Sequence, residues 1–318
     1  MSKFNKILIT GAAGFIGSHV YDHFSVIFPN AQINILDKMT YAANIKNIPL
    51  ILEKVNHNLI VGDLIDFDIC LNATKGVDLV INLAAESHVD NSFNNSIIFS
   101  RSNALGTHTL MEACKQNKVK QIIHVSTDEV YGENVDTAFT EEDRFNPTNP
   151  YSASKAAAEM IVKSYFTSFN LPVIVVRANN IYGVRQFPEK IIPKFTLRCI
   201  DGLTLELHGD GSNLRHYLAA SDFAKALEVL ISKGKNGEAY NIASNLELSN
   251  LEVAKLIISH FPEKEIKIDY VTNRPFNDSR YAVNDDKLRS LGWSPKRSLV
   301  DDIPEIISWY KTNLHWYK

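Results

Sequence analysis

Three adjacent residues in the run HVSTDEVYG, Thr127, Asp128 and Glu129, place two carboxylates side by side. Tyr151 and Lys155 follow further along the chain, in the run YSASK. A tyrosine and a lysine are enough for a dehydrogenase, in which a phenolate takes the proton of a hydroxyl group. The removal of water needs an acid at one carbon and a base at the next, and the neighbouring carboxylates supply both. The combination predicts an enzyme that oxidises and dehydrates its substrate.

Tyr151 and Lys155 lie four positions apart at the start of a predicted helix, so their side chains share one face. A nearby ammonium group favours the phenolate, so we expect Lys155 to lower the pKa of Tyr151. A phenolate near neutral pH can accept the proton of a sugar hydroxyl. The same spacing also occurs by chance in ordinary amphipathic helices, and this alternative stays open on spacing alone.

Thr127, Asp128 and Glu129 follow a predicted strand over Gln121–Ser126. Residues just beyond the carboxyl end of a parallel strand line the crevice in which ligands bind. The alternative is a solvated loop in which an aspartate caps the next helix. If this strand lies inside a parallel sheet, the three residues are expected to form a ligand site rather than a solvated loop.

Short apolar runs alternate with helical patterns through the first half of the chain, which is typical of a doubly wound, Rossmann-type α/β sheet. Several of the runs are rich in valine and isoleucine without alternation, as in a sheet buried on both faces. The predicted strands are Lys6–Thr10, Ile33–Asp37, Leu59–Val61, Asp78–Leu83, Gln121–Ser126 and Val173–Arg177, and the predicted helices include Phe15–Phe28, Thr107–Asn117 and Ser152–Phe169.

Loops become longer and richer in Gly, Pro and Arg after about residue 180. We therefore predict a Rossmann-type domain over residues 1–180 and a smaller C-terminal substrate-binding domain over 181–216 and 244–318. The segment 217–243 resembles one more helix and strand, over Ser221–Lys233 and Ala239–Ala243, and is expected to return to the main sheet.

The composition excludes several classes of protein. The 318 residues carry a net charge of −3 without a long basic run, which gives nucleic-acid binding no electrostatic support. Every apolar stretch is shorter than the roughly 20 residues that span a membrane. Lys3 and Lys6 before an apolar run resemble a signal peptide, but the glycines that follow favour a strand entering a turn. Cys70, Cys114 and Cys199 match no metal-binding spacing and indicate reduced thiols, as in the cytoplasm.

A glycine-rich turn, Gly11-Ala-Ala-Gly14-Phe-Ile-Gly17, directly follows the first predicted strand and opens a helix. Such glycines allow a tight turn and the close approach of a pyrophosphate to the helix N-terminus. Asp37 ends the second predicted strand, where a carboxylate accepts hydrogen bonds from a ribose diol and repels a 2′-phosphate. The pattern favours NAD over NADP. Asp63, after the third strand, is either an adenine-side contact or a surface turn residue.

The chain resembles the extended short-chain dehydrogenase/reductases, and among them the nucleotide-sugar 4,6-dehydratases. The matching runs are GAAGFIGSH, LDKMTYAAN, NLAAESHVDNS, HVSTDEVYG, NPYSASKAAAE and RQFPEKIIPKF, with weaker similarity in HGDGSNLRHYL and RPFNDSRY. Together they cover the chain nearly from end to end. STDEVYG is the most specific, because related sugar epimerases usually carry small residues in place of Asp128 and Glu129.

The resemblance implies a reaction in three stages. Tyr151, helped by Lys155 and Thr127, removes the C4 hydroxyl proton while NAD takes the C4 hydride. Glu129 then removes the C5 proton, Asp128 protonates the departing C6 hydroxyl, and water leaves. NADH returns its hydride to C6, which gives a 4-keto-6-deoxy sugar of the kind used for rhamnose and other deoxysugars.

The resemblance also implies the ligand contacts. Cofactor contacts are expected from Gly11, Gly14, Phe15, Ile16, Gly17, Asp37, Lys38, Thr40, Asp63, Leu64, Leu83, Ala84, Ala85, Tyr151 and Lys155. Members of the family commonly form homodimers, for which Ser100–Lys115 and Ala153–Phe169 are apolar enough. The alternative is that the same apolar faces pack on the sheet.

Substrate contacts are expected from Thr127 and from four further groups of residues. Ser87 and His88, with Glu86 beside them, match the segment near the nicotinamide and sugar, and Asn180, Glu189 and Lys190 match positions that hold the hexose and diphosphate. Arg215 matches an arginine on the phosphates, and Asn250 and Arg280 match residues near the nucleotide end.

The chain departs from the bacterial dTDP-glucose enzymes in two runs, 215–222 and 274–281. The second includes Phe276-Asn277-Asp278 and resembles the UDP-glucose enzymes and the dTDP-glucose-like eukaryotic and viral relatives. The expected substrate is therefore UDP-glucose or dTDP-glucose, with a lean to the former. The rival functions are a nucleotide-sugar epimerase or decarboxylase, and a non-catalytic NAD-binding regulator. The complete set of Thr127, Asp128, Glu129, Tyr151 and Lys155 argues against both.

Overall fold

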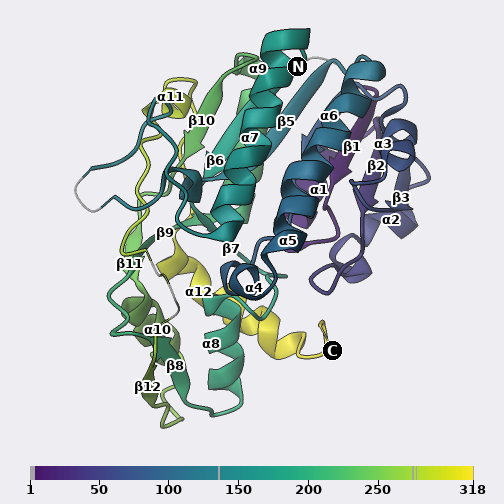
Figure 1. Cartoon of the computed structure of the whole chain (residues 1–318). Coiled ribbons are helices and arrows are strands. Elements are labelled where there is room, and N and C mark those ends of the chain that lie inside the picture. The colour runs from purple at the N-terminus through teal and green to yellow at the C-terminus, as the bar shows by residue number, and fades with distance from the viewer. Residues whose placement is uncertain (1–3, 135–136, 274–275, 277, 318) are drawn as a thin grey trace.

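The computed structural model describes residues 4–134, 137–273, 276 and 278–317. Its centre is a sheet of seven strands, all parallel, in the order β10-β6-β5-β4-β1-β2-β3 (Figure 1). The strands are β1 Lys6–Thr10, β2 Gln32–Asp37, β3 His57–Val61, β4 Leu79–Asn82, β5 Gln121–Thr127, β6 Val173–Ala178 and β10 Ala239–Ile242. The predicted Rossmann-type class is confirmed, and each strand end lies within two residues of its predicted place.

Helices cover both faces of this sheet, which explains why its strands lack alternation. Ile7, Leu8 and Ile9 of β1 are all fully buried. Ile7 and Ile9 pack in the core with α1 (Phe15–Ile27) and α9 (Ala220–Lys233). Leu8 packs in the opposite core with three other helices, α3 Phe67–Thr74, α6 Gly106–Gln116 and α7 Pro150–Phe169.

The direction in which the chain winds reverses between β1 and β4. From β1 the sheet grows through β2 to β3, and the chain then crosses to β4 and grows the other way through β5, β6 and β10. Ligands in such sheets bind beyond the carboxyl ends of the strands at this reversal. The glycine-rich turn follows β1, and Thr127 is the last residue of β5, so both lie on the expected edge.

A smaller lobe lies below the large sheet in the view of Figure 1. Its core is formed by α8 (Ile191–Ile200), α10 (Asn250–Ile258), α12 (Leu299–Thr312) and the strands beside them. The strands are β7 Asn180–Tyr182, β8 Leu205–His208, β9 Leu214–Ala219, β11 Glu247–Ser249 and β12 Ile268–Val271. They form a three-stranded sheet, β11-β9-β7, and a pair, β12-β8. After α9 the chain re-enters the large sheet, where β10 pairs with β6; the domain boundaries themselves stay a prediction.

The remaining elements are short. They are α2 Leu50–Glu53, α4 Val89–Asn94, α5 Ser96–Phe99, α11 Asp286–Arg289, two 3₁₀ helices over Ile45–Asn47 and Asp128–Tyr131, and a π-helical stretch over Ser100–Leu105. Within the described residues, every helix is too short or too polar to cross a bilayer. Cys70, Cys114 and Cys199 are buried free thiols.

Candidate active site

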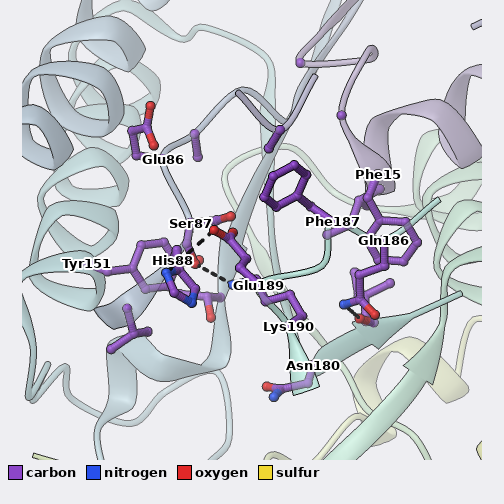
Figure 2. Close-up of a pocket in the computed structure, with 18 of the residues that line it drawn as sticks. Phe15, Glu86, Ser87, His88, Tyr151, Asn180, Gln186, Phe187, Glu189 and Lys190 are labelled. Carbon is purple, nitrogen blue, oxygen red and sulfur yellow. Dashed lines mark hydrogen bonds and ion pairs between the residues drawn. The ribbon is translucent and has the colours of Figure 1, made fainter. Parts of the chain in front are cut away.

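One cavity of about 490 Å³ runs from the glycine-rich turn past Tyr151 to the smaller lobe (Figure 2). Its volume suits a small-molecule ligand. All the expected cofactor residues line it: Gly11, Gly14, Phe15, Ile16, Gly17, Asp37, Lys38, Thr40, Asp63, Leu64, Leu83, Ala84, Ala85, Tyr151 and Lys155. So do Glu86, Ser87, His88, Thr127, Glu129, Asn180, Glu189, Lys190, Arg215 and Asn250. Asp128 and Arg280 do not line it.

The glycine-rich turn has the shape that a pyrophosphate requires. Gly11 has a φ of +69°, and a Cβ there would lie 2.8 Å from the backbone of Ala84. A Cβ on Gly17 would lie 2.2 Å from the carbonyl oxygen of Gly11, so α1 packs against the turn only with glycine there. Gly14 begins α1 without a side-chain cap and without an acidic residue in the first turn. The first N–H groups of α1 are thus available for an anion.

Asp37 ends β2 beside the turn, as expected. Its Oδ2 accepts a hydrogen bond from Ala13 N at 2.9 Å and its Oδ1 accepts one from Met39 N at 2.8 Å. Each carboxylate oxygen can accept a second hydrogen bond, so a ribose diol can still be bound. Asp63 also lines the cavity, where its Oδ2 lies 2.7 Å from Lys38 Nζ. Asp63 Oδ1 also accepts a hydrogen bond from Ile65 N at 3.2 Å, so Asp63 both lines the cavity and forms a turn, and its contact with the adenine side stays a prediction.

The expected effect of Lys155 on Tyr151 is wrong for this structure. Lys155 Nζ donates a hydrogen bond to Val125 O at 2.7 Å, and burial lowers its pKa to about 8. Burial raises the pKa of Tyr151, and the charges of Glu129 and Asp128 add to the rise. Only the hydrogen bond with Thr127 acts in the other direction. The pair does share one face of α7, but without a ligand Tyr151 is the neutral phenol.

Asp128 is 3% exposed and held from two sides. Thr127 Oγ1 donates to its Oδ1 at 3.2 Å, and Asn179 Nδ2 donates to its Oδ2 at 2.8 Å. Burial raises the pKa of Asp128 to about 7, with the Glu129 charge adding to the effect of burial. The side chain is neither solvated nor a helix cap, because Thr127 caps the 3₁₀ helix Asp128–Tyr131. Near neutral pH a large fraction of Asp128 carries a proton.

Glu129 faces the cavity, and burial raises the pKa of its carboxyl group. Asn149 Nδ2 donates to Glu129 Oε2 at 3.2 Å. Asn149 is also the N-cap of α7, with its Oδ1 accepting from Ser152 N at 2.9 Å. One asparagine therefore fixes Glu129 relative to the helix that carries Tyr151 and Lys155.

A buried ion pair lies next to the 3₁₀ helix Asp128–Tyr131 and holds it in place. Arg177 of β6 contacts Glu159 of α7 through NH2 and Oε2 at 2.9 Å. The same guanidinium group donates to the hydroxyl of Tyr131 at the end of the 3₁₀ helix. Tyr131 also donates to Asn241 Oδ1 of β10 at 2.9 Å. The orientation of Asp128 and Glu129 thus depends on two strands of the large sheet, β6 and β10, and on the helix α7.

The residues that are expected to contact the sugar line another part of the cavity (Figure 2). Lys190 Nζ donates to Ser87 O at 2.9 Å, and Glu189 Oε2 lies 3.6 Å from His88 Nδ1. These contacts join the end of β4 to the loop that precedes α8. Asn180 lines the same space from β7.

The expected phosphate and nucleotide residues are only partly brought together. Arg215 is buried in the wall, where its NH2 donates to Asp278 O at 2.9 Å and its guanidinium group lies 4.7 Å from the Tyr281 ring centre. Asn250 lines the cavity, whereas Arg280 points to Glu247, with Nε 2.7 Å from Oε1. Of the run 274–281, Arg274, Pro275 and Asn277 lie outside the described residues.

Sequence reasoning missed four residues that shape the site. Asn149 and Asn179 hold the two carboxylates, and Gln186 and Phe187 line the cavity near Phe15 (Figure 2). The motif Asn-Pro at the start of α7 signals a cap, but the contact with Glu129 spans residues far apart in the chain. We find no local signal for Gln186 and Phe187, which lie in a loop.

Known proteins resemble this chain over nearly its whole length. A family model described as GDP-mannose 4,6 dehydratase matches residues 8–306. A trifunctional UDP-glucose 4,6-dehydratase, epimerase and reductase of Arabidopsis thaliana is 46% identical over 98% of this chain. The chain spans about half of that relative, 48% of its length. The dTDP-D-glucose 4,6-dehydratase of Dictyostelium discoideum is 42% identical over 98% of this chain and 83% of the relative.

Among solved structures, the dTDP-glucose 4,6-dehydratase DesIV from Streptomyces venezuelae superposes with a TM-score of 0.94. It is 34% identical, and the match covers 98% of this chain and 99% of DesIV. That structure holds NAD and the ligand named TYD.

Proposed function

The chain belongs to the GDP-mannose 4,6 dehydratase family, within the extended short-chain dehydrogenase/reductases, and from this membership we propose that it dehydrates a nucleoside-diphosphoglucose. The substrate is UDP-glucose or dTDP-glucose, and the product is the 4-keto-6-deoxy sugar. The observation that carries the proposal is the pair Asp128 and Glu129 beside Tyr151, because an epimerase has no use for an acid and a base at adjacent carbons. A binding protein without catalysis has no use for any of the three.

The cofactor of this reaction is NAD. The turn Gly11–Gly17 and the start of α1 suit its pyrophosphate, Asp37 suits a ribose, and Thr127, Tyr151 and Lys155 lie where the cavity continues toward the sugar wall. When bound, the nicotinamide accepts a hydride from the sugar and later returns it. The carboxylate of Asp37 disfavours the 2′-phosphate of NADP.

The protein moves the protons. Tyr151, hydrogen-bonded to Thr127, acts as the base in its phenolate form, so it must first lose its own proton before it takes the proton of the C4 hydroxyl group. Glu129 takes the C5 proton, which the C4 ketone makes acidic, and its raised pKa makes it the stronger base. Asp128 gives a proton to the departing C6 hydroxyl, and its pKa of about 7 leaves it a proton to give. To reach the sugar, the Asp128 carboxyl group must turn from the Asn179 amide toward the cavity.

The state of Asp128 predicts how the loss of water depends on pH. An acid with a pKa of about 7 is protonated below that pH and ionised above it. We therefore expect the rate of water loss to fall roughly tenfold per pH unit above about pH 8, and to fall also at acid pH, where Glu129 is protonated and cannot act as the base. Single-turnover product formation, followed by mass spectrometry across this range, measures it.

The matched variant is Asp128→Asn, which cannot donate in the same way. It should lower the rate near neutral pH and abolish the decline at high pH. A decline that persists unchanged in Asp128→Asn would assign it to another group and contradict the role of Asp128.

Substrate identity is tested by offering UDP-glucose, dTDP-glucose and GDP-mannose in parallel with added NAD. Loss of one water from either glucose donor is the expected result. The donor that reacts faster identifies the nucleotide, uridine or thymidine, that the site prefers. An unchanged mass with a new sugar would indicate an epimerase instead. No reaction with any donor, or dehydration of GDP-mannose alone, would contradict the proposal.

We also propose a homodimer in the cytoplasm. Apolar side chains are exposed on α5 and α7 and on the π-helical stretch between α5 and α6, which pack against one another. They are Ile97, Ile98, Leu105, Met160 and Phe169. A second copy of this chain would remove them from water.

A further inference from the structure

The segment that follows α12, residues Asn313–Tyr317, is folded back toward the cofactor end of the cavity. Asn313 N donates to Trp309 O at 2.9 Å, and Trp316 N donates to Asn313 O at 2.9 Å. The Trp316 ring packs edge-on against Trp309 of α12, with ring centres 5.2 Å apart. Figure 1 shows this end of the chain passing from the smaller lobe toward the large sheet. Trp316 therefore has a defined position relative to the smaller lobe.

Trp316 is joined to the glycine-rich turn through two asparagines, Asn47 and Asn44. Its Nε1 donates to Asn47 Oδ1 at 2.7 Å, and Asn47 Nδ2 donates to Ala13 O at 2.7 Å. Asn47 is fully buried. Asn44 makes a parallel connection, since its side chain donates to Trp316 O while its backbone N donates to Ala13 O at 2.9 Å. Ala13 in turn donates its N–H to Asp37. The connection therefore reaches both the glycine-rich turn and Asp37, which are expected to bind the cofactor.

Tyr317 joins the same segment to the loop before α8. Its hydroxyl donates to Arg185 O, and its ring lies 5.0 Å from that of Phe187, edge to face. Phe187 packs in the same manner on Tyr41, at 5.3 Å. Arg185 NH1 donates to Asn47 O at 2.8 Å, which closes a ring of contacts among the three parts.

The two loops that Trp316 and Tyr317 contact form part of the cavity wall. Thr40, Ala42 and Ala43 line it from the loop after β2, and Gln186 and Phe187 line it from the loop before α8.

The loop after β2 is anchored to the glycine-rich turn through Asn44 and Asn47. The loop before α8 is anchored to α1 and α12 through His19, Asp22 and Tyr310. The segment after α12 contacts both loops and so joins them to each other. Without the segment, the described contacts between the two loops include the Tyr41–Phe187 ring pair, the Tyr41–Glu189 hydrogen bond and the Arg185–Asn47 hydrogen bond.

We propose that Trp316 and Tyr317 are positioning residues that clamp these two loops over the cofactor and keep it bound through each catalytic cycle; the inference rests on the proposed function. In that reaction the hydride removed from C4 returns to C6, so the cofactor ends each turnover in the form in which it began. Release between the two transfers would leave the sugar unfinished. A clamp supplied by a distant segment is therefore useful in this reaction, whereas a dehydrogenase that exchanges its cofactor needs a cavity that opens.

The test is cofactor retention, measured without substrate. Wild-type protein, Trp316→Ala and Tyr317→Phe are loaded with NAD and passed through gel filtration, and the NAD left per chain is then followed during dilution. We expect Trp316→Ala to lose NAD at least tenfold faster than wild type, and Tyr317→Phe, which lacks only the hydroxyl contact, to lose it at an intermediate rate. Excess NAD should restore the single-turnover rate of Trp316→Ala.

The control is Tyr270→Ala, which removes a largely exposed ring from β12 in the smaller lobe. It should retain NAD as wild type does, and thermal melting with saturating NAD should show all variants folded. Retention by Trp316→Ala equal to that of wild type would overturn the clamp and leave the proposed function standing. A wild type that holds no NAD at all would contradict the proposed function and the clamp with it.

Discussion

Replacing Glu129 with glutamine is expected to stop the reaction after oxidation at C4. Glutamine keeps the size of the side chain and its contact with Asn149, but it cannot accept the C5 proton. We expect water loss to slow by on the order of 10³-fold, within the usual range for the loss of a general base. The C4 oxidation does not need Glu129, so a 4-ketoglucose nucleotide of unchanged carbon skeleton should accumulate.

Two measurements check this expectation. Mass spectrometry of the quenched mixture separates the 4-keto sugar from the dehydrated product, and reaction in deuterated water reports whether C5 exchanges its hydrogen. The Glu129→Gln variant should accumulate the 4-keto sugar and show no exchange of hydrogen at C5. The matched control, Glu142→Gln, makes the same change at an exposed position and should behave as wild type. Dehydration by Glu129→Gln at the wild-type rate would remove Glu129 from the mechanism.

Replacing Tyr151 with phenylalanine should block the reaction one step earlier. The ring would still pack edge-on against Phe99, whose centre is 6.3 Å away, so the fold is retained. Without the hydroxyl group nothing takes the C4 proton, and we expect a loss of about 10³-fold or more in the formation of any 4-keto sugar. Neither the ketone nor the dehydrated sugar should then appear in a single turnover.

The control for this variant lies on the same helix. Tyr165 donates its hydroxyl to Glu112 Oε2 at 2.9 Å, away from the cavity, so Tyr165→Phe should leave the rate unchanged. Because Tyr151→Phe keeps the cavity shape, it should also retain NAD on gel filtration. C4 oxidation by Tyr151→Phe at a rate near that of wild type would show that another group is the base.

Much of the fold follows from local patterns in the sequence. The apolar runs of β1, β4 and β5 are buried on both faces, and the turn from Gly11 to Gly17 needs only neighbouring residues to take its shape. The N-cap of α7 is equally local, since Asn149, Pro150 and Ser152 are close in the chain. Periodicity and turn chemistry act between near neighbours, so the sequence displays them directly.

The electrostatic state of the site could not be predicted in this way. The spacing of Tyr151 and Lys155 suggested a lowered tyrosine pKa, whereas burial raises it and Lys155 is bound to Val125 O. Burial depends on every element packed around a group, and a carbonyl acceptor on a neighbouring strand competes for the ammonium group. The side chain of Arg280 likewise points to Glu247 rather than into the cavity.

By itself, the sequence determined which residues can do the chemistry: a glycine turn for a dinucleotide, a tyrosine and lysine on one helix face, and two adjacent carboxylates after a strand. The tertiary structure decided how they are held. Asn179 and Asn149 bind Asp128 and Glu129 from other elements, and Trp316 reaches Ala13 through Asn47 across most of the chain. Residue types and short spacings are written in the sequence, whereas desolvation and contacts between distant segments arise only when the chain is folded.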